Sequence, residues 1–323
     1  MNIYPLLRLL ADGRQHSGAE LAESLGLSRT AVWKQLKHIG EAGLAVRAVR
    51  GQGYQLPGPL DLLDGQRIEA GLSGEVRESV SIECHPVVRS TNDVLMQKPF
   101  LGAPFHLCLA EQQTAGKGRR GRSWVSPFAA NLYLSVACEV EAAGEVIQGL
   151  SLALGVAVAE ALEQLGVTGV GLKWPNDVLV DGRKVAGILV ELQGSVGDRF
   201  RVVSGIGLNV WMKPDQGQGI DRPWTSLALV DQVPEGGRNQ LAVMVIEKTV
   251  ERLNRFFREG IPSVREAWAA RDALEGRPVT VLGRELQGTG AGIDSEGRLR
   301  VIRDDGGEEQ VNAGEVSVRE SGA

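Results

Sequence analysis

Apolar residues follow three patterns along the chain, and each pattern predicts a different kind of structure. Residues 4–56 combine helical apolar spacing with two short strand-like runs at their end. The middle of the chain alternates runs of strand length with longer helical stretches. The strand-like runs cover residues 80–88, 105–110, 131–140, 178–180, 184–192 and 200–210. The helical stretches cover residues 150–165, 239–258 and 263–273. Residues 276–319 consist of short strands between Gly/Asp turns. Separate blocks of this kind predict an α+β multidomain protein.

The first block has the spacing of a helix-turn-helix. Helical apolar spacing over 4–10 is followed by Ser17 and Glu20, which predict a capping box at the start of a second helix. Gly26 ends this helix, and a third, basic helix is expected over 29–39. In a helix-turn-helix module, the helix that follows the turn enters the major groove of DNA.

Residues 46–56 predict a two-stranded hairpin that would form the wing of this module. Residues 1–56 carry seven Lys/Arg and four Asp/Glu, a net charge of +3. Because the whole chain has a net charge of −5, the remaining residues carry −8. A basic module on an acidic body indicates a polyanion partner for the module. We favour DNA over the alternative, a small protein-interaction domain. The expected DNA contacts are Ser28, Arg29, Thr30, Trp33, Lys34, Arg47 and Arg50.

The run from Glu111 to Trp124 holds the densest candidate chemistry. Four cations lie among three glycines, and an indole closes the run. Glycine lets the backbone approach a ligand closely, and guanidinium groups match carboxylate and phosphate groups. The run therefore predicts an anion-binding loop, with Trp124 placed to cover a flat group; a solvated basic turn is the alternative. The cations are Lys117, Arg119, Arg120 and Arg122.

Several common sites are excluded by spacing. Residues 116–121 satisfy G-x-G-x-x-G, but a Rossmann site needs a helix directly afterwards, and here a strand follows residues 123–127. The chain has no G-x-x-x-x-G-K-[ST] loop and no kinase signature. Its three cysteines are too scattered for a disulfide framework or a zinc cluster, and its four histidines lack ligand spacing.

Polar residues also stand at the ends of predicted strands. Residues 90–92 (Ser-Thr-Asn) follow one strand, Lys184 begins another, and Asn209 ends a third. The structural alternatives are helix caps for residues 90–92 and an edge-strand charge for Lys184. Residues 212–225 form a long loop rich in Gly and Pro that ends near Trp224, so this loop is either functional or disordered.

Targeting signals are not evident in the sequence. The N-terminus lacks the features of a secretory signal. The most apolar run, residues 150–165, is too short to span a bilayer and is interrupted by Glu160 and Glu163. We therefore expect a cytoplasmic protein.

Five motifs in a fixed order carry a resemblance to a known family. They are Ser90-Thr-Asn92, Gly116-Lys-Gly-Arg-Arg-Gly121, Lys173-Trp-Pro-Asn-Asp177, Lys184-x-x-Gly187-Ile-Leu-Val-Glu191 and Gly205-Ile-Gly-Leu-Asn209. Over essentially its whole length the chain resembles the bifunctional biotin–protein ligases that also repress the biotin operon. The resemblance implies a winged helix-turn-helix (1–58), a class II synthetase-like ligase domain with a central mixed β-sheet and helices (59–273), and an SH3-like C-terminal β-barrel (274–323).

The resemblance also implies a reaction and a set of site residues. Biotin and MgATP would form biotinyl-5′-adenylate, and biotin would then pass to a lysine of a biotin carboxyl carrier protein. Lys184 and Arg119 would be catalytic, and Asp177 is the candidate Mg²⁺ ligand. The expected biotin contacts are Ser90, Thr91, Asn92, Gln113, Lys117, Gly118, Arg119 and Lys184. The expected ATP or adenylate contacts are Arg120, Arg122, Trp124, Lys173, Asn176, Asp177, Asn209 and Trp224, with Trp124 stacked on adenine.

One residue departs from the family pattern. Position 117 is usually arginine, and lysine keeps the charge but loses the bidentate fork, so we expect less side-chain recognition at Lys117 than at Arg119. The resemblance further implies an adenylate-loaded homodimer that binds a two-fold operator. Two alternatives remain: a biotin-sensing transcription factor with little ligase activity, and a lipoate-attaching ligase of related fold.

Overall fold

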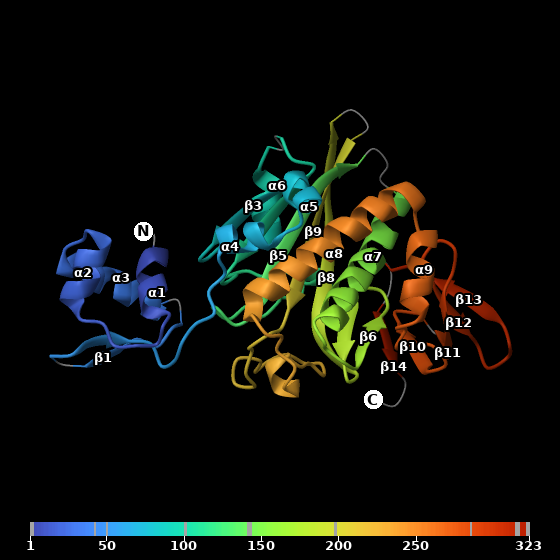
Figure 1. Ribbon diagram of the computed structural model, residues 1–323. Helices are drawn as coiled ribbons and strands as arrows, with labels where there is room; N and C mark the ends of the chain where they lie inside the picture. The colour runs from blue at the N-terminus through green and yellow to red at the C-terminus, as the bar shows by residue number, and fades with distance from the viewer. Residues whose placement is uncertain are drawn as a thin grey trace.

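The computed structural model describes residues 3–41, 43–49, 51–99, 102–140, 144–196, 199–284, 286–313 and 317–320. Figure 1 shows a small N-terminal module, a large body built on one sheet, and a second sheet beside the body near the C-terminus. This arrangement confirms the predicted order of a helix-turn-helix module, a mixed-sheet body and a small β end. In the described part of the chain, no helix combines the length and the apolar character needed to cross a membrane.

The N-terminal module has the predicted elements. They are α1 (Tyr4–Leu10), α2 (Gly18–Leu25), α3 (Arg29–Glu41), β1 (Arg47–Val49) and β2 (Gly53–Gln55). The predicted capping box is present, because Ser17 Oγ accepts from Glu20 N at 3.1 Å and Glu20 Oε2 accepts from Ser17 N at 2.9 Å. Gly26 ends α2 with a φ of 61°, a left-handed conformation that glycine adopts without strain. The antiparallel pair β1–β2 forms the expected wing.

The linker helix is shorter than the sequence suggested. The sequence between the N-terminal block and the body favours a connecting helix over residues 60–72, whereas α4 covers only Gly65–Gly71. The reason is Asp64, whose side chain accepts hydrogen bonds from the backbone N of Gln66 and Arg67 at 3.0 and 3.2 Å. Because this carboxylate caps the first turn, the helix begins after residue 64. Residues 60–64 instead bridge the module and the body, for example through Leu60 N, which donates to Ala11 O at 2.8 Å.

A seven-stranded mixed sheet forms the centre of the body, in the order β3-β4-β5-β9-β8-β7-β6. Only the β3–β4 pair is parallel. The strands are β3 (Val80–His85), β4 (Phe105–Ala110), β5 (Leu132–Val140), β6 (Val170–Lys173), β7 (Asp177–Val180), β8 (Arg183–Val196) and β9 (Arg199–Leu208). The β7–β8 hairpin turns at Asp181 and Gly182, whose φ angles of 49° and 72° fit the two-residue turn that an Asp-Gly pair favours.

Helices cover this sheet and complete its core. They are α5 (Gly74–Ser79), α6 (Thr91–Gln97), α7 (Gly144–Gln164), α8 (Gly237–Glu259) and α9 (Pro262–Ala269), with short 3₁₀ turns η1 (Arg119–Gly121) and η2 (Ala228–Val230). Figure 1 shows α7 and α8 side by side across one face of the sheet. Leu241, Val245 and Val250 share the apolar face of α8 and are buried there.

The C-terminal part is a five-stranded antiparallel sheet in the order β13-β12-β11-β10-β14. Its strands are β10 (Pro278–Leu282), β11 (Leu286–Ile293), β12 (Leu299–Ile302), β13 (Glu308–Val311) and β14 (Ser317–Glu320). It is joined to the body by buried contacts, since Trp174 Nε1 donates to Gly297 O at 3.1 Å. This attachment brings the end of β13 close to the basic loop, which matters for the site.

Candidate functional site

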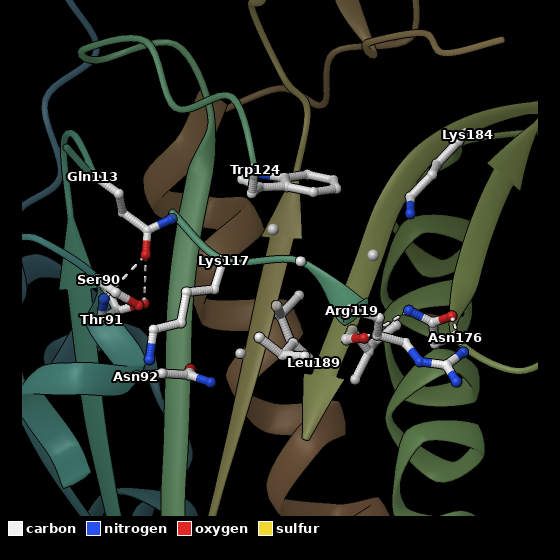
Figure 2. Close-up of a pocket in the computed structure, with 16 residues that line it drawn as sticks. Ser90, Thr91, Asn92, Gln113, Lys117, Arg119, Trp124, Asn176, Lys184 and Leu189 are labelled. Carbon is white, nitrogen blue, oxygen red and sulfur yellow. Dashed lines mark hydrogen bonds between the residues drawn. The ribbon is translucent and has the colours of Figure 1, made fainter. Parts of the chain in front are cut away.

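A pocket lies between the basic loop and strands β8 and β9 (Figure 2). Ten predicted site residues line it together, although they come from four separate stretches of the chain. They are Ser90, Thr91, Asn92, Gln113, Lys117, Gly118, Arg119, Trp124, Asn176 and Lys184. The other lining residues are Gly187, Ile188, Leu189, Gly205, Ile206 and Gly207.

One end of the pocket is a network of neutral polar groups. Thr91 donates to Gln113 Oε1 from its backbone N at 3.0 Å and from its hydroxyl at 3.1 Å. Ser135 Oγ on β5 lies 2.6 Å from Asn92 Oδ1. Ser90 is the N-cap of α6, yet its side chain makes no capping hydrogen bond. The capping alternative therefore does not account for Ser90, and this end suits a neutral group with donors and acceptors.

The opposite end is roofed by the indole of Trp124, which rests on two glycines. A Cβ atom at Gly207 would lie 2.4 Å from Trp124 Cε2, and one at Gly187 would lie 3.1 Å from the same ring. The two glycines face each other across the β8–β9 pair. A side chain at either position would occupy the space that the indole needs, so this pair of glycines creates a flat seat for the ring.

Lys184 lies beside this ring at the start of β8. Its Nζ is 5.3 Å from the Trp124 ring centroid and 2.5 Å from Asp177 Oδ1. Its backbone holds the end of the long loop, because Lys184 N donates to Pro223 O at 3.2 Å and Thr225 N donates to Lys184 O at 2.8 Å. The ammonium is thus positioned by a carboxylate and an aromatic face, while the strand itself anchors residues 223–225.

Arg119 links the loop to two other parts of the molecule. Its guanidinium donates to Asn176 Oδ1 at 3.1 Å and to the carbonyl oxygen of Ala313, which follows β13. Burial lowers the pKa of Arg119 below its ordinary value, with Asp177 acting in the opposite direction. The contact with Ala313 was missed from the sequence, which assigned no site residue to the C-terminal domain.

The remaining predicted adenylate contacts lie outside the pocket lining. Asp177 is occupied by Lys184, and Asn209 is buried with its Nδ2 donating to Thr225 O at 3.0 Å. Trp224 packs inside its own loop, since a Cβ atom at Gly217 would fall 1.9 Å from the Trp224 ring. Arg120 and Arg122 are exposed on the loop, and Lys173 is half-buried at the end of β6. Their roles toward a nucleotide stay predictions.

The charge of the pocket lining is uniformly positive. Lys117, Arg119 and Lys184 contribute cations, and the described lining contains no carboxylate. Such a lining fits an anion, whereas Mg²⁺ prefers carboxylate and water oxygens. Asp177 is the nearest predicted metal ligand, but Lys184 already bonds its Oδ1. These side chains therefore do not fit a metal ion held by the protein alone.

Comparison with known proteins agrees with this geometry. Sequence profiles match the chain for an HTH domain (residues 4–55), the Biotin/lipoate A/B protein ligase family (84–209) and the Biotin protein ligase C terminal domain (276–319). The Bifunctional ligase/repressor BirA of Salmonella typhimurium is 40% identical over 316 residues, which cover 97% of this chain and 96% of the relative. The protein of the same name from Escherichia coli is 39% identical over 320 residues, with the same shares covered. The chain belongs to the bifunctional biotin ligase/repressor family.

The fold of this family is also found in solved structures. The biotin protein ligase from Aquifex aeolicus in complex with biotin and ATP superposes with a TM-score of 0.65 at 27% identity, covering 75% of this chain and 99% of that chain.

Two acidic residues near the pocket of the present protein were not predicted as site residues. Asp93 and Glu191 both bond Lys117, at 2.5 and 3.3 Å. Glu191 is the last residue of the fourth motif, so its place in that motif could have identified it as a site residue.

The predicted DNA-reading face of the ligase is exposed. All six described candidates (Ser28, Arg29, Thr30, Trp33, Lys34 and Arg47) are exposed, on α3, on the turn before it and on the wing, whereas Arg50 lies outside the described residues. The Trp33 side chain on α3 is 56% exposed, which is unusual for an indole without a partner surface. An exposed aromatic ring among cations on α3, the helix that follows the turn, suits contact with DNA.

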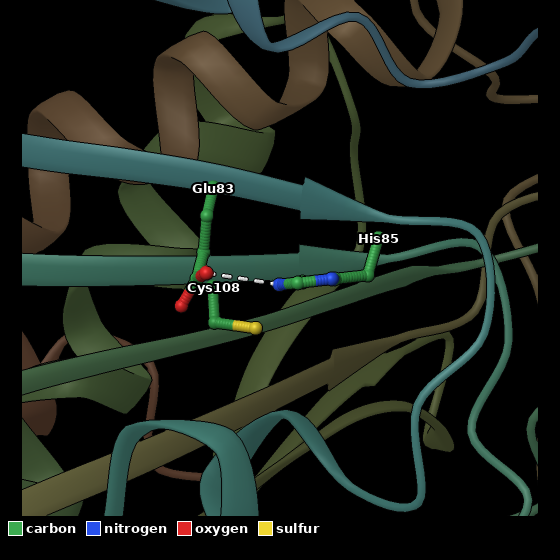
Figure 3. Close-up of side chains that lie close together, drawn as sticks. All are labelled: Glu83, His85 and Cys108. Atoms are coloured by element: carbon green, nitrogen blue, oxygen red, sulfur yellow. Dashed lines mark hydrogen bonds and ion pairs between the residues drawn. The ribbon is translucent and has the colours of Figure 1, made fainter. Parts of the chain in front are cut away.

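A second polar cluster lies on β3 and β4, where Glu83, His85 and Cys108 come together (Figure 3). Linear spacing had given no sign of it, because the parallel pairing places Glu83 opposite Cys108. His85 Nε2 and Lys98 Nζ lie 2.9 and 2.5 Å from the same Glu83 oxygen. Burial raises the pKa of the Cys108 thiol. The carboxylate is thus neutralised by the protein's own cation, and the cluster needs no metal.

Proposed function

We propose that the protein activates biotin with ATP and attaches it to a carrier protein. In the first step, an oxygen of the biotin carboxylate attacks the α-phosphorus of ATP, forming biotinyl-5′-adenylate and releasing pyrophosphate. In the second step, the amine of a carrier lysine attacks the biotinyl carbonyl, an amide forms, and AMP leaves with the bonding electron pair. The carrier by this proposal is a biotin carboxyl carrier protein, and the reaction takes place in the cytoplasm.

The observation that carries this proposal is the division of the pocket into two chemically different ends. The neutral network around Thr91, Asn92 and Gln113 matches the donors and acceptors of the biotin ureido ring. Lys184 lies beside the Trp124 ring and Arg119 lines the same pocket, so both cations are available to a carboxylate and an α-phosphate that meet there. Fixed positive charge reduces the repulsion between these two anions, and such preorganised charge is usually the largest contribution to catalysis.

In this proposal Lys184 acts on the reacting atoms. When the anions enter, its ammonium exchanges Asp177 for the biotin carboxyl oxygen and the α-phosphate, while Trp124 covers the adenine. Magnesium enters with ATP and supplies charge neutralisation on the phosphates. Because the lining offers no carboxylate, we assign it no protein ligand, and Asp177 keeps the role of orienting Lys184.

The test is ATP-dependent transfer of biotin to a purified carrier domain. Lys184→Ala is expected to reduce transfer by at least about a hundredfold, the usual loss when one charge-stabilising donor is removed. Lys248→Ala is the matched control, because Lys248 lies on α8, outside the pocket, and pairs with Glu251 at 3.1 Å. A wild-type chain that transfers no biotin, or a Lys184→Ala variant with full activity, would sink the proposal.

A competition between biotin and lipoate in the same assay separates the lipoate alternative. The neutral end of the pocket favours biotin, because lipoate's dithiolane ring offers no N–H donors to the network around Gln113. We expect excess lipoate to leave biotin transfer unchanged, and preferential transfer of lipoate would reverse the substrate assignment. Transfer by the wild type would also exclude a sensor that lacks ligase activity.

We further propose that the adenylate-bound protein dimerises and represses transcription through paired winged helices. The exposed basic face of α3 and the wing supports the DNA-binding half of this proposal. A pool of random duplexes selected with the full-length protein, with and without biotin plus ATP, tests both halves. We expect two-fold symmetric sites to be enriched when both ligands are present, with a dimer in sedimentation. If the same DNA sites were enriched with and without biotin plus ATP, the proposed coupling between ligand binding and DNA binding would be contradicted.

A further inference from the structure

Lys117 is held by two carboxylates from different elements. Its Nζ lies 2.5 Å from Asp93 Oδ1 on α6 and 3.3 Å from Glu191 Oε1 on β8. The hydrogen bond that Lys117 donates to Asp93 is the main reason that the pKa of Lys117 is raised. One ammonium thus ties the basic loop to both a helix and a strand, across the mouth of the pocket.

These contacts continue directly into the neutral end of the pocket. Glu191 uses its second oxygen, Oε2, to accept from Asn92 Nδ2 at 2.7 Å. Asn92 Oδ1 in turn lies 2.6 Å from Ser135 Oγ. Figure 2 shows the Lys117 side chain extending from the loop toward Asn92. The carboxylate that holds the loop therefore also fixes the orientation of the Asn92 amide.

The balance of charge at this point requires a cation. Asp93 and Glu191 place two negative charges near the neutral end, with side chains that are 27% and 28% exposed. Lys117 is the cation bonded to both among the described residues. A compact ammonium on a flexible stem can turn its three donors toward two separate carboxylates, whereas a guanidinium holds its donors in a rigid plane. The geometry thus gives the lysine at this position a use of its own.

We propose that Lys117 is a latch that holds the basic loop closed over the pocket, and that it does not bind the biotin carboxylate. It is a positioning residue that acts through Asp93 and Glu191 and slows the release of ligand. The proposal rests on the proposed function for the identity of the ligand. It differs from the expectation that Lys117 contacts biotin directly.

The decisive experiment compares biotin with its alcohol analogue, biotinol, which lacks the carboxylate. Affinity and dissociation rate are measured for the wild type and for Lys117→Met, Lys117→Arg and the control Lys248→Met. A partly exposed ion pair is worth up to about 1 kcal/mol, or roughly fivefold in affinity. We therefore expect Lys117→Met to release both ligands roughly threefold to fivefold faster, with Lys117→Arg recovering part of the loss and Lys248→Met showing none.

A loss confined to biotin, with biotinol unaffected, would overturn the latch, because it would show direct recognition of the carboxylate. Equal behaviour of Lys117→Met and the wild type would overturn it as well. Asp93→Asn provides the double-mutant cycle: we expect it to accelerate release in the wild type and to add little in Lys117→Met. Independent effects of the two substitutions would contradict the pairing.

Limited trypsin digestion of the ligand-free protein separates this proposal from the proposed function. Cleavage after Arg120 and Arg122 reports loop opening, and both residues are exposed. We expect faster cleavage at these sites in Lys117→Met than in the wild type and Lys248→Met. A wild type that binds no biotin would defeat the proposed function, while these cleavage rates would still decide whether the latch exists.

Discussion

The buried ion pair between Glu111 and Arg238 is the contact whose loss should destabilise the protein most. The two side chains are 1% and 0% exposed, and Arg238 donates to Glu111 Oε2 at 2.7 Å. Glu111 Oε1 also accepts from Leu63 N at 2.6 Å and from Tyr4 Oη at 3.2 Å. Arg238 further donates to Asn131 O at 3.0 Å. One pair thus joins α1, the linker, the start of the basic loop and α8.

Arg238→Met removes the cation and leaves the Glu111 carboxylate buried. Removing one partner of a buried pair typically costs about 3–5 kcal/mol, because the other charge is left uncompensated. That is a large fraction of the roughly 5–15 kcal/mol by which a native protein is stable. The double variant Glu111→Leu/Arg238→Met removes both charges, so we expect it to regain much of the loss. Tyr4→Phe removes one neutral hydroxyl, whose proton is shared between Leu63 O and Glu111 Oε1, and should cost only about 1 kcal/mol.

Urea unfolding followed by tryptophan fluorescence measures these differences in the free energy of unfolding. The six tryptophans include Trp174 and Trp268, which are buried in the body and report on its unfolding. The expected order of stability is wild type, Tyr4→Phe, the double variant and then Arg238→Met. The reasoning is refuted if Arg238→Met unfolds at the same urea concentration as the wild type, or if the double variant is less stable than Arg238→Met.

Three further predictions concern the pocket and the cysteines. Gly207→Ala places a methyl group 2.4 Å from the Trp124 ring. Because overpacking of this kind costs about 1–3 kcal/mol, KM for ATP should rise roughly tenfold or more, while KM for biotin changes less. Gly205→Ala places one 2.6 Å from Asn92 Oδ1, so KM for biotin should rise instead, and equal effects of both variants on both substrates would contradict the assignment of the two ends. Burial raises the pKa of the Cys84 and Cys138 thiols to about 12, so at pH 8 iodoacetamide should label the folded protein far more slowly than the unfolded chain; comparable rates would show that these thiols are accessible.

The parts of the fold that sequence predicted well are those in which the deciding contacts are local. The capping box of Ser17 and Glu20 lies within a single turn of helix, so the residue types alone predict it. The turn at Asp181 and Gly182 is similarly fixed by two residues that tolerate positive φ. The linker helix was misjudged because its N-cap, Asp64, lies inside a run whose apolar spacing looked continuous.

The site was predictable as a set of residues, but its internal contacts were not. The five motifs contain eight of the ten predicted site residues that line the pocket, whereas the pairing of Lys117 with Asp93 and Glu191 joins positions up to 74 residues apart. Asn209 shows a second such contact: the resemblance implies that it meets the adenylate, and in the structure its Nδ2 donates to the backbone oxygen of Thr225 at 3.0 Å. Only the three-dimensional pairing of strands reveals which polar groups are already occupied.

The closed position of the basic loop depends on three such pairings, and each involves a different partner. Trp124 rests on Gly187 and Gly207, which become neighbours only through the register of β8 and β9. Lys117 bonds carboxylates of α6 and β8, and Arg119 bonds the carbonyl after β13. The loop's own backbone hydrogen bonds, from Gly118 N to Arg122 O at 2.7 Å and from Trp124 N to Gly116 O at 2.9 Å, fix its internal shape. Its position over the pocket depends on the three outside partners, so a change in any one of them can alter how the pocket closes.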